Sequence, residues 1–147
     1  MQRWIVAGLV FVVLLMGGGY FAYRTYQQNR TTRIWLPLPM SEVAVEQRRE
    51  TTTLLKKRLS DPLLMEVVCK DSGYAKTMGF ASDEEGSKDL LKRFFCEIGT
   101  TPDGKLPAIN VGFSCKVKDF SKMGPVTNRL RKDILRILGL PEPVEPF

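Results

Sequence analysis

The stretch Pro107–Asp119, PAINVGFSCKVKD, carries the clearest strand pattern in the chain. Every second residue is apolar: Ile109, Val111, Phe113, Cys115 and Val117. The residues between them are polar or small: Asn110, Gly112, Ser114 and Lys116. A period of two predicts a β-strand with one face in a hydrophobic core and the other face outside it.

Two further strands are predicted around this one. The turn signal Thr101–Lys105, TPDGK, joins it to a preceding strand that contains Cys96–Thr100, CEIGT. In Arg33–Pro39, RIWLPLP, the residues Ile34, Leu36 and Leu38 alternate with Trp35 and Pro37, which is again a strand pattern. Because Pro37 has no N–H to donate to a ladder, this strand should be an edge strand or a strand end.

Helical patterns fill the region between the first and second strands. Ser41 can cap a helix that runs to Ser60. The apolar stripe of this helix is thin, which indicates that the helix is well exposed. Pro62 opens a second helix, capped by Ser60 or Asp61 and ending near Gly73. Its apolar set is Leu63, Leu64, Val67 and Val68. Tyr74–Phe80 is expected to be a connector.

Two helices complete the predicted domain. Ser82 and Glu85 form a capping box for one that turns Leu90, Leu91 and Phe94 inward and exposes Lys88, Lys92 and Arg93. The last helix covers Asp119–Leu138, and Gly124–Pro125 marks either a kink in it or its true start. The fold class is therefore α+β, with a small, mainly antiparallel sheet of about three strands and helices on one face.

The segment Trp4–Tyr23, WIVAGLVFVVLLMGGGYFAY, has no charged residue and lies between Arg3 and Arg24. As a helix it would rise roughly 30 Å, the thickness of a bilayer core. A cleaved signal peptide is the alternative, but it would have a shorter apolar core and then a small-x-small site. We therefore expect one retained transmembrane helix.

The expected boundaries are a flank at 1–3, a transmembrane helix at 4–23, a juxtamembrane linker at 24–32, an α+β domain at 33–139 and a proline-rich tail at 140–147. The orientation has two readings. The arginines after the segment favour a cytoplasmic domain by the positive-inside rule. The short N-terminal flank is typical of a signal-anchor, which exports the remainder of the chain, and we expect export.

The charge distribution excludes a nucleic-acid-binding domain. The chain has 22 basic and 16 acidic residues, and residues 1–40 hold four of the basic and none of the acidic ones. The remainder is therefore near balance. The surplus lies beside the predicted bilayer, where lipid phosphates attract it.

The residue types also argue against an enzyme. Histidine is absent, which removes the commonest general base and most zinc sites. Cys69, Cys96 and Cys115 lie in apolar or alternating runs and should be small buried residues. A Cys96–Cys115 bridge is conceivable between neighbouring strands, but the turn would set the two out of register.

Three other candidate sites each have a structural explanation. The acidic run Asp83–Glu85 fits a helix N-terminus. Gly99–Lys105 faintly suggests a phosphate loop, although a hairpin explains its Gly and Asp. Arg129, Lys132 and Arg136 form either a stripe for phosphate, acidic glycan or lipid, or a solvated helix face. We predict no catalytic residue, no cofactor and no metal site.

Three stretches, residues 52–73, 81–100 and 106–139, together resemble the periplasmic base domain of chain-length-determinant proteins, the bacterial inner-membrane polysaccharide co-polymerases. Within them, Arg58–Tyr74, Leu90–Ile98 and Ile109–Asp119 match the family's pattern by spacing and residue class, and the similarity covers roughly residues 31–140. Family members usually have a second, C-terminal membrane helix. Some also have a cytoplasmic kinase segment. This chain looks like the base domain alone, held by one anchor.

The resemblance implies an inner-membrane protein with a periplasmic domain that serves surface polysaccharide assembly or export. We expect a single-pass, non-enzymatic scaffold that contacts the lipid bilayer, copies of itself or other membrane proteins, and a polysaccharide. The alternative is a membrane-tethered component of a secretion or cell-envelope machine that binds a protein partner.

Overall fold

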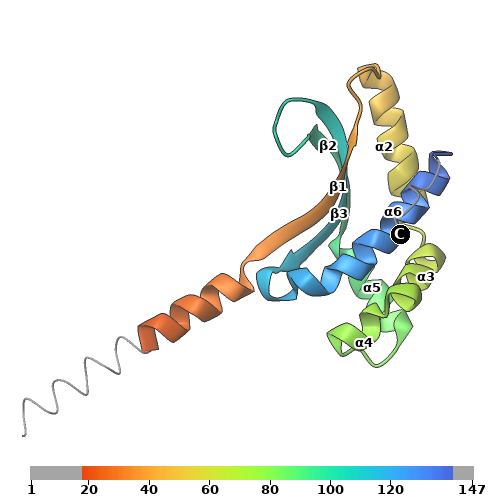
Figure 1. Cartoon of the computed structure of the whole chain (residues 1–147). Coiled ribbons are helices and arrows are strands. Elements are labelled where there is room, and N and C mark those ends of the chain that lie inside the picture. The colour runs from red at the N-terminus through yellow and green to blue at the C-terminus, as the bar shows by residue number, and fades with distance from the viewer. Residues whose placement is uncertain (1–17, 141–147) are drawn as a thin grey trace, which may run out of the picture.

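A computed structural model describes residues 18–140 of the chain (Figure 1). The predicted flank at 1–3, most of the predicted transmembrane segment, and the tail from 141 lie outside these residues. Residues 18–29 form an exposed helix that leads into the domain (Figure 1). Among the helices of residues 18–140, none combines the length and the apolar character that crossing a bilayer requires.

The sheet has three antiparallel strands, as predicted. They are β1 (Thr31–Pro39), β2 (Phe94–Thr100) and β3 (Pro107–Lys116), in the order β1-β3-β2. The alternating strand β3 is therefore central, and β1 is an edge strand, as Pro37 indicated. The predicted linker 24–32 is helical as far as residue 29, and β1 begins at Thr31, two residues before the expected boundary.

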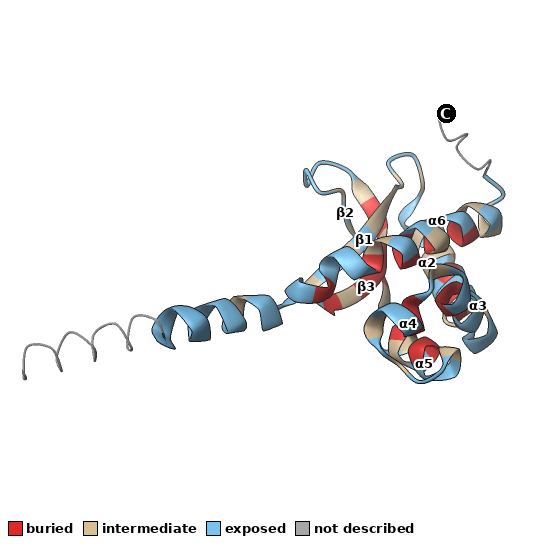
Figure 2. Cartoon of the chain, turned by 60° about the horizontal axis from the view of Figure 1, so that its bottom comes forward, coloured by how far each residue is buried: buried red, intermediate tan, exposed pale blue. Residues whose placement is uncertain are grey.

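The helices lie on one side of this sheet (Figures 1 and 2). They are α2 (Val45–Leu59), α3 (Pro62–Ser72), α4 (Tyr74–Met78), α5 (Asp83–Arg93), the 3-10 helix η1 (Val117–Met123) and α6 (Gly124–Ile137). Ile109, Val111 and Phe113 of β3 are fully buried under them. From the helices, the same cluster includes Leu55, Leu59, Met65, Val68, Leu90, Val126, Leu130 and Ile134.

The predicted caps are present at two helices, and the structure shows where the last helix begins. The Asp61 side chain accepts a hydrogen bond from the Leu63 N–H at 2.9 Å. Ser82 accepts from the Glu85 N–H at 3.2 Å, and Glu85 in turn accepts from the Ala81 N–H at 3.2 Å. Gly124 is the true start of α6, because the preceding residues form η1.

The predicted cap at Ser41 is wrong. Residues 41–43 form a turn, and α2 begins at Val45 after Ala44. The chain continues in the extended direction beyond β1, since the Met40 N–H donates to the Pro107 carbonyl at 2.9 Å. The turn then closes through the Val43 N–H and the Met40 carbonyl at 3.3 Å. The sheet contact thus delays the helix by one turn.

The expected connector Tyr74–Phe80 is mostly helix α4, with Tyr74 and Ala75 buried. Gly73 and Gly79 enclose it, each at a positive φ that favours glycine. The short helix was missed because two glycine stops so close together are typical of a loop.

The predicted inward face of α3 is partly wrong. Leu63 and Val67 are 74% and 46% exposed. Val68 and Cys69 are buried as predicted, and Met65, which the prediction left out of the apolar set, is buried with them. The helix turns this way because it packs against α5 at Gly86, where an added Cβ would lie 2.6 Å from the Cys69 sulfur.

The structure differs from the inward position predicted for Val117 and from the exposure predicted for Arg93. Val117 is 46% exposed because the strand ends at Lys116 and η1 begins there. Arg93 is half-buried and donates to Asp89 at 2.6 Å. Phe94 packs against the core as predicted, but it belongs to β2 instead of the helix, and its ring centre lies 5.9 Å from that of Phe113 in an edge-to-face contact.

Candidate functional site

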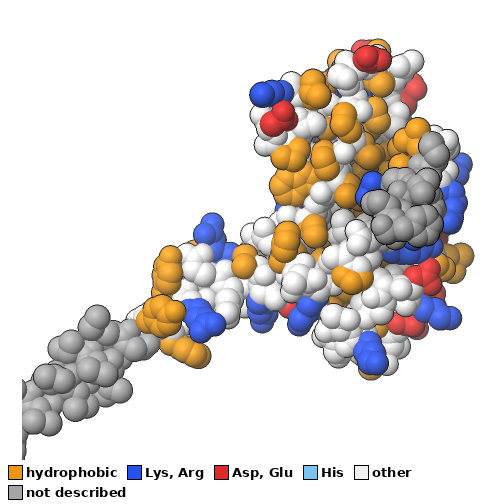
Figure 3. All heavy atoms as spheres, in the orientation of Figure 1, with side chains coloured by type: hydrophobic (Ala, Val, Ile, Leu, Met, Phe, Trp, Pro, Cys, Tyr) orange, Lys and Arg blue, Asp and Glu red, His pale blue; other side chains and the backbone are white. Residues whose placement is uncertain are grey.

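The face of the sheet that points away from the helices carries the candidate site. Here Trp35 of β1 and Phe95 of β2 lie opposite Gly112, one on each side of the central strand. Trp35 is 39% exposed and Phe95 is half-buried. We call this surface the outer face. Hydrophobic side chains also gather over the strands between the β2–β3 hairpin and α2 (Figure 3).

The glycine at position 112 is a requirement of the strand pairing. A Cβ there would collide with the Ile34 carbonyl oxygen and lie 2.6 Å from the Trp35 Cα. Since both atoms belong to the backbone of β1, no side-chain rotation could relieve the clash. The two aromatic residues therefore flank a strip that has no side chain at its centre, where Gly112 is itself buried.

An ion pair crosses the outer face at this strip. Arg33 Nη1 lies 2.6 Å from Glu97 Oε1, and the two residues belong to opposite edge strands. The Arg33 guanidinium carbon also lies 4.8 Å from the centre of the Phe95 ring, a cation–π distance. Both charged side chains are about half exposed, so the pair contributes little to stability and both groups can meet a partner.

Asn110 adds a polar group next to the ion pair. Its amide nitrogen donates to the Thr100 carbonyl at 3.3 Å, and its Oδ1 is buried without a hydrogen-bond partner among the described residues. Aromatic rings with an exposed cation, a carboxylate and an amide can bind a surface of matching shape. Among the described residues of this face, no nucleophile is paired with a base.

The free edge of β1 is protected against pairing with another strand. Successive backbone nitrogens of a strand point to opposite sides, and the Met40 N–H points to β3. The nitrogens of Pro39 and Pro37 therefore point away from β3, to the free edge of β1. Proline has no N–H, so two donors of this edge are missing. A strand added at this edge would therefore lack two hydrogen bonds.

The acidic run and the hairpin have the structural roles that the sequence indicates. Asp83, Glu84 and Glu85 form the first turn of α5, and Glu84 pairs with Lys88 at 2.7 Å. In the hairpin the Thr101 N–H donates to the Leu106 carbonyl at 2.9 Å. The Thr101 hydroxyl donates to Asp103, which lowers the pKa of that carboxyl.

The basic stripe on α6, Arg129, Lys132 and Arg136, is neither a free ligand-binding stripe nor wholly a solvated helix face. Arg129 is largely buried, and its guanidinium contacts Asp71 at 2.9 Å and Asp133 at 2.7 Å. Arg136 lies 3.5 Å from Asp133, while Lys132 is exposed. Arg129 therefore joins α6 to α3 instead of facing a ligand.

The three cysteines are free and buried, as predicted. Cys96 lies opposite Val111, four residues from Cys115 along β3, so the expected mismatch in register is confirmed. Burial raises the pKa of Cys96 to about 11, which keeps it a neutral thiol. Within residues 18–140, no group of three acidic or cysteine side chains could hold a metal ion.

The outer face was missed from the sequence because its residues come from three strands. In the sequence Trp35 only alternates with Ile34 and Leu36, and the register of the strands is what brings it to Gly112 and Phe95. Comparisons with protein-family models, with curated proteins and with solved structures find no match for this chain.

Proposed function

We propose that this chain is a single-pass, membrane-anchored, non-enzymatic assembly protein whose exported domain binds a second copy of itself through the outer face. The observation that carries the proposal is the Trp35–Gly112–Phe95 row, with the Arg33–Glu97 pair across it. A sheet face that no described helix of the domain covers, with two aromatic residues at its centre, is suited to a protein contact.

The second copy is favoured because the outer face is complementary to itself. It carries one cation and one anion about equally exposed, on opposite edge strands. In a two-fold dimer the same patch faces its copy, so Arg33 of each protomer can approach Glu97 of the other. The resemblance to chain-length-determinant proteins supports a role in surface polysaccharide assembly or export in the bacterial inner membrane.

Anchorage is tested by fractionation of cells that express the full chain. We expect the protein to remain with membranes after an alkaline carbonate wash and to be released by detergent, because the uncharged segment Trp4–Tyr23 can span the bilayer. N-terminal sequencing should find a start upstream of Tyr23. Release without detergent, or a start beyond Tyr23, would show that the anchor is absent.

Self-association is tested by charge reversal in the detergent-solubilised full chain. Arg33→Glu and Glu97→Arg each leave the outer face with charges of one sign, so each variant alone should sediment as a monomer. Mixing the two should restore the dimer, because the opposite charges then meet across the interface. Lys132→Glu, on an exposed site of α6, is the control and should dimerise like the wild type.

A wild type that is monomeric at every concentration would refute the self-association. A dimer that persists in both single variants would place the contact elsewhere. A monomeric wild type that retains an envelope protein in cross-linking, with loss of that protein from the Trp35→Ala variant, would instead favour the secretion or envelope machine.

A further inference from the structure

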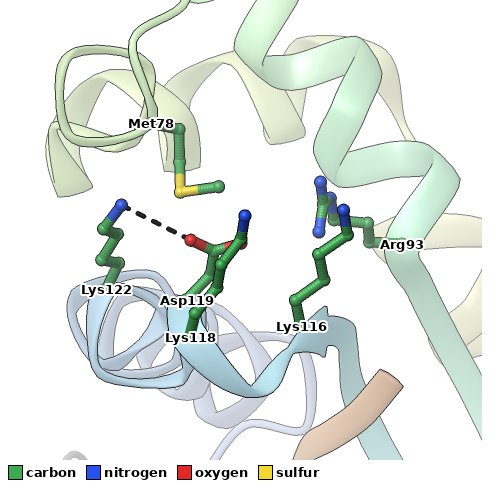
Figure 4. A pocket seen from close by; sticks show the side chains of 6 residues that line it. All are labelled: Met78, Arg93, Lys116, Lys118, Asp119 and Lys122. Carbon is green, nitrogen blue, oxygen red and sulfur yellow. Dashed lines mark ion pairs between the residues drawn. The ribbon is translucent and has the colours of Figure 1, made fainter. Parts of the chain in front are cut away.

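A basic hollow of about 490 Å³ lies at the end of the domain next to the N-terminal helix. It is lined by Met78, Arg93, Lys116, Lys118, Asp119 and Lys122, which come from α4, α5, β3 and η1 (Figure 4). Four cations thus surround a single carboxylate. That carboxylate is itself 7% exposed and lies 3.4 Å from Lys122.

The cations of the hollow are held in different ways. The Arg93 Nε donates to Asp89 at 2.6 Å, and Asp89 also accepts from the Tyr74 hydroxyl at 2.7 Å, so the guanidinium is fixed from behind. Lys116 and Lys118 form no ion pair within residues 18–140 and are exposed. The hollow therefore has an excess of positive charge that these residues do not neutralise. Arginine and lysine side chains with such an excess of charge bind phosphate oxygens.

The hollow is tied to the junction between the N-terminal helix and the sheet. Lys116 pairs with Thr31, the first residue of β1, and the Val117 N–H donates to the Arg30 carbonyl at 3.0 Å. Residues 24–29 continue the helix beyond Tyr23 and rise about 9 Å. That rise is comparable to the polar headgroup region on one side of a bilayer.

Apolar side chains accompany the cations on the same 3-10 helix. Val117 and Phe120 of η1 are 46% and 45% exposed. Exposed aromatic and aliphatic residues between lysines are typical of segments that lie in a membrane interface. Lys and Arg side chains also line the lower edge of the domain beside the N-terminal helix (Figure 3).

We propose that this hollow binds the phosphate of an anionic lipid headgroup and sets the domain against the membrane surface. The inference rests on the proposed anchor. The phosphate oxygens would lie among Arg93, Lys116, Lys118 and Lys122, while Val117 and Phe120 enter the interface beside them. A free phosphate has the same chemistry, but it would not explain the exposed apolar residues of η1.

The test is amide hydrogen exchange of residues 116–123 in the full chain, reconstituted in nanodiscs. We expect slower exchange in an equimolar mixture of phosphatidylcholine and phosphatidylglycerol than in phosphatidylcholine alone. Lys118→Gln/Lys122→Gln should remove this difference, since each lysine near an anionic surface strengthens binding on the order of fivefold. Lys88→Gln/Lys132→Gln, at two exposed lysines that do not line the hollow, is the matched control and should keep the difference.

Equal exchange in the two lipid mixtures would overturn the inference, as would an effect that survives Lys118→Gln/Lys122→Gln. Slow exchange produced by inorganic phosphate in phosphatidylcholine discs, with no further effect of the anionic lipid, would overturn the lipid as the source of the phosphate. A chain that does not stay in the discs would refute the anchor itself, which separates that failure from a failure of the hollow.

Discussion

Gly112 lies in the central strand with Trp35 and Phe95 opposite it on the neighbouring strands. Its missing side chain lets β1 approach and lets Arg33 reach Glu97 across the sheet. From the sequence alone Gly112 is one of several small residues on the polar side of a strand, and nothing local distinguishes it. Its importance arises from the register, which is a property of the folded chain.

Replacing Gly112 with alanine should lower the free energy of unfolding by about 3 kcal/mol, because the added Cβ meets backbone atoms that cannot move aside. Urea unfolding monitored by circular dichroism measures the change. Gly124→Ala is the control, since that residue has helical angles and open space for a Cβ. Similar midpoints for the two variants would contradict the close approach of β1.

Helices α3 and α6 are joined by charged groups as well as by apolar contacts. Arg129 bridges Asp71 of α3 and Asp133 of α6, and the Asp133 side chain is 3% exposed. Asp71 is about half exposed, so its share of the stabilisation is small. The buried Asp133 is the group that depends on Arg129.

Arg129→Ala should therefore lower the free energy of unfolding by about 2–3 kcal/mol, because a buried carboxylate loses its nearest cation while Arg136 remains at 3.5 Å. Arg129→Lys should recover only part of the loss, since one ammonium cannot contact both carboxylates as a fork does. Lys132→Ala on the same helix should behave like the wild type in the same urea titration. An equal loss in Lys132→Ala would mean that the helix surface, not the buried pair, is responsible.

Elements with a strong period were predictable, and those set by contacts were not. The period of two in β3 and the cap signals at Asp61 and Ser82 are local, and the structure has all three. The start of α2 depends on a sheet contact of Met40, and the orientation of α3 depends on its fit against Gly86. These depend on residues far away in the sequence, so no local pattern could indicate them.

At the scale of the whole molecule, the candidate site was less predictable than the fold. The α+β class is indicated by the order of helical and strand patterns along the chain. The outer face and the basic hollow each combine residues from several elements. Of the basic stripe on α6, Arg129 is used internally, because Asp71 and Asp133 lie within its reach, whereas Lys132 and Arg136 are exposed.

The stability of the whole molecule should fall in alkali. Burial raises the pKa of Cys69, Cys96 and Cys115, and burial together with the hydrogen bond to Asp89 raises that of Tyr74. A raised pKa in the folded state means that the unfolded chain loses its proton first. The contribution of Cys96 to the free energy of unfolding is thus complete below pH 9.0 and lost as the pH passes about 11.

Urea titrations at about pH 8 and about pH 10.5 should show a lower free energy of unfolding at the higher pH, in line with this linkage. In Cys96→Ala the fall should be smaller, because one of the groups that titrate is gone. Identical falls in the wild type and the variant would show that Cys96 ionises alike in both states.

The two prolines on the free edge of β1 also limit how copies of this protein can meet. A sheet edge with all its donors can add the same strand from a neighbour again and again, and that growth has no natural end. With nitrogens that cannot donate at Pro37 and Pro39, an encounter at this edge should fail to propagate. Association through the outer face, by contrast, is completed once two copies have met, so this contact should give closed pairs instead of fibres.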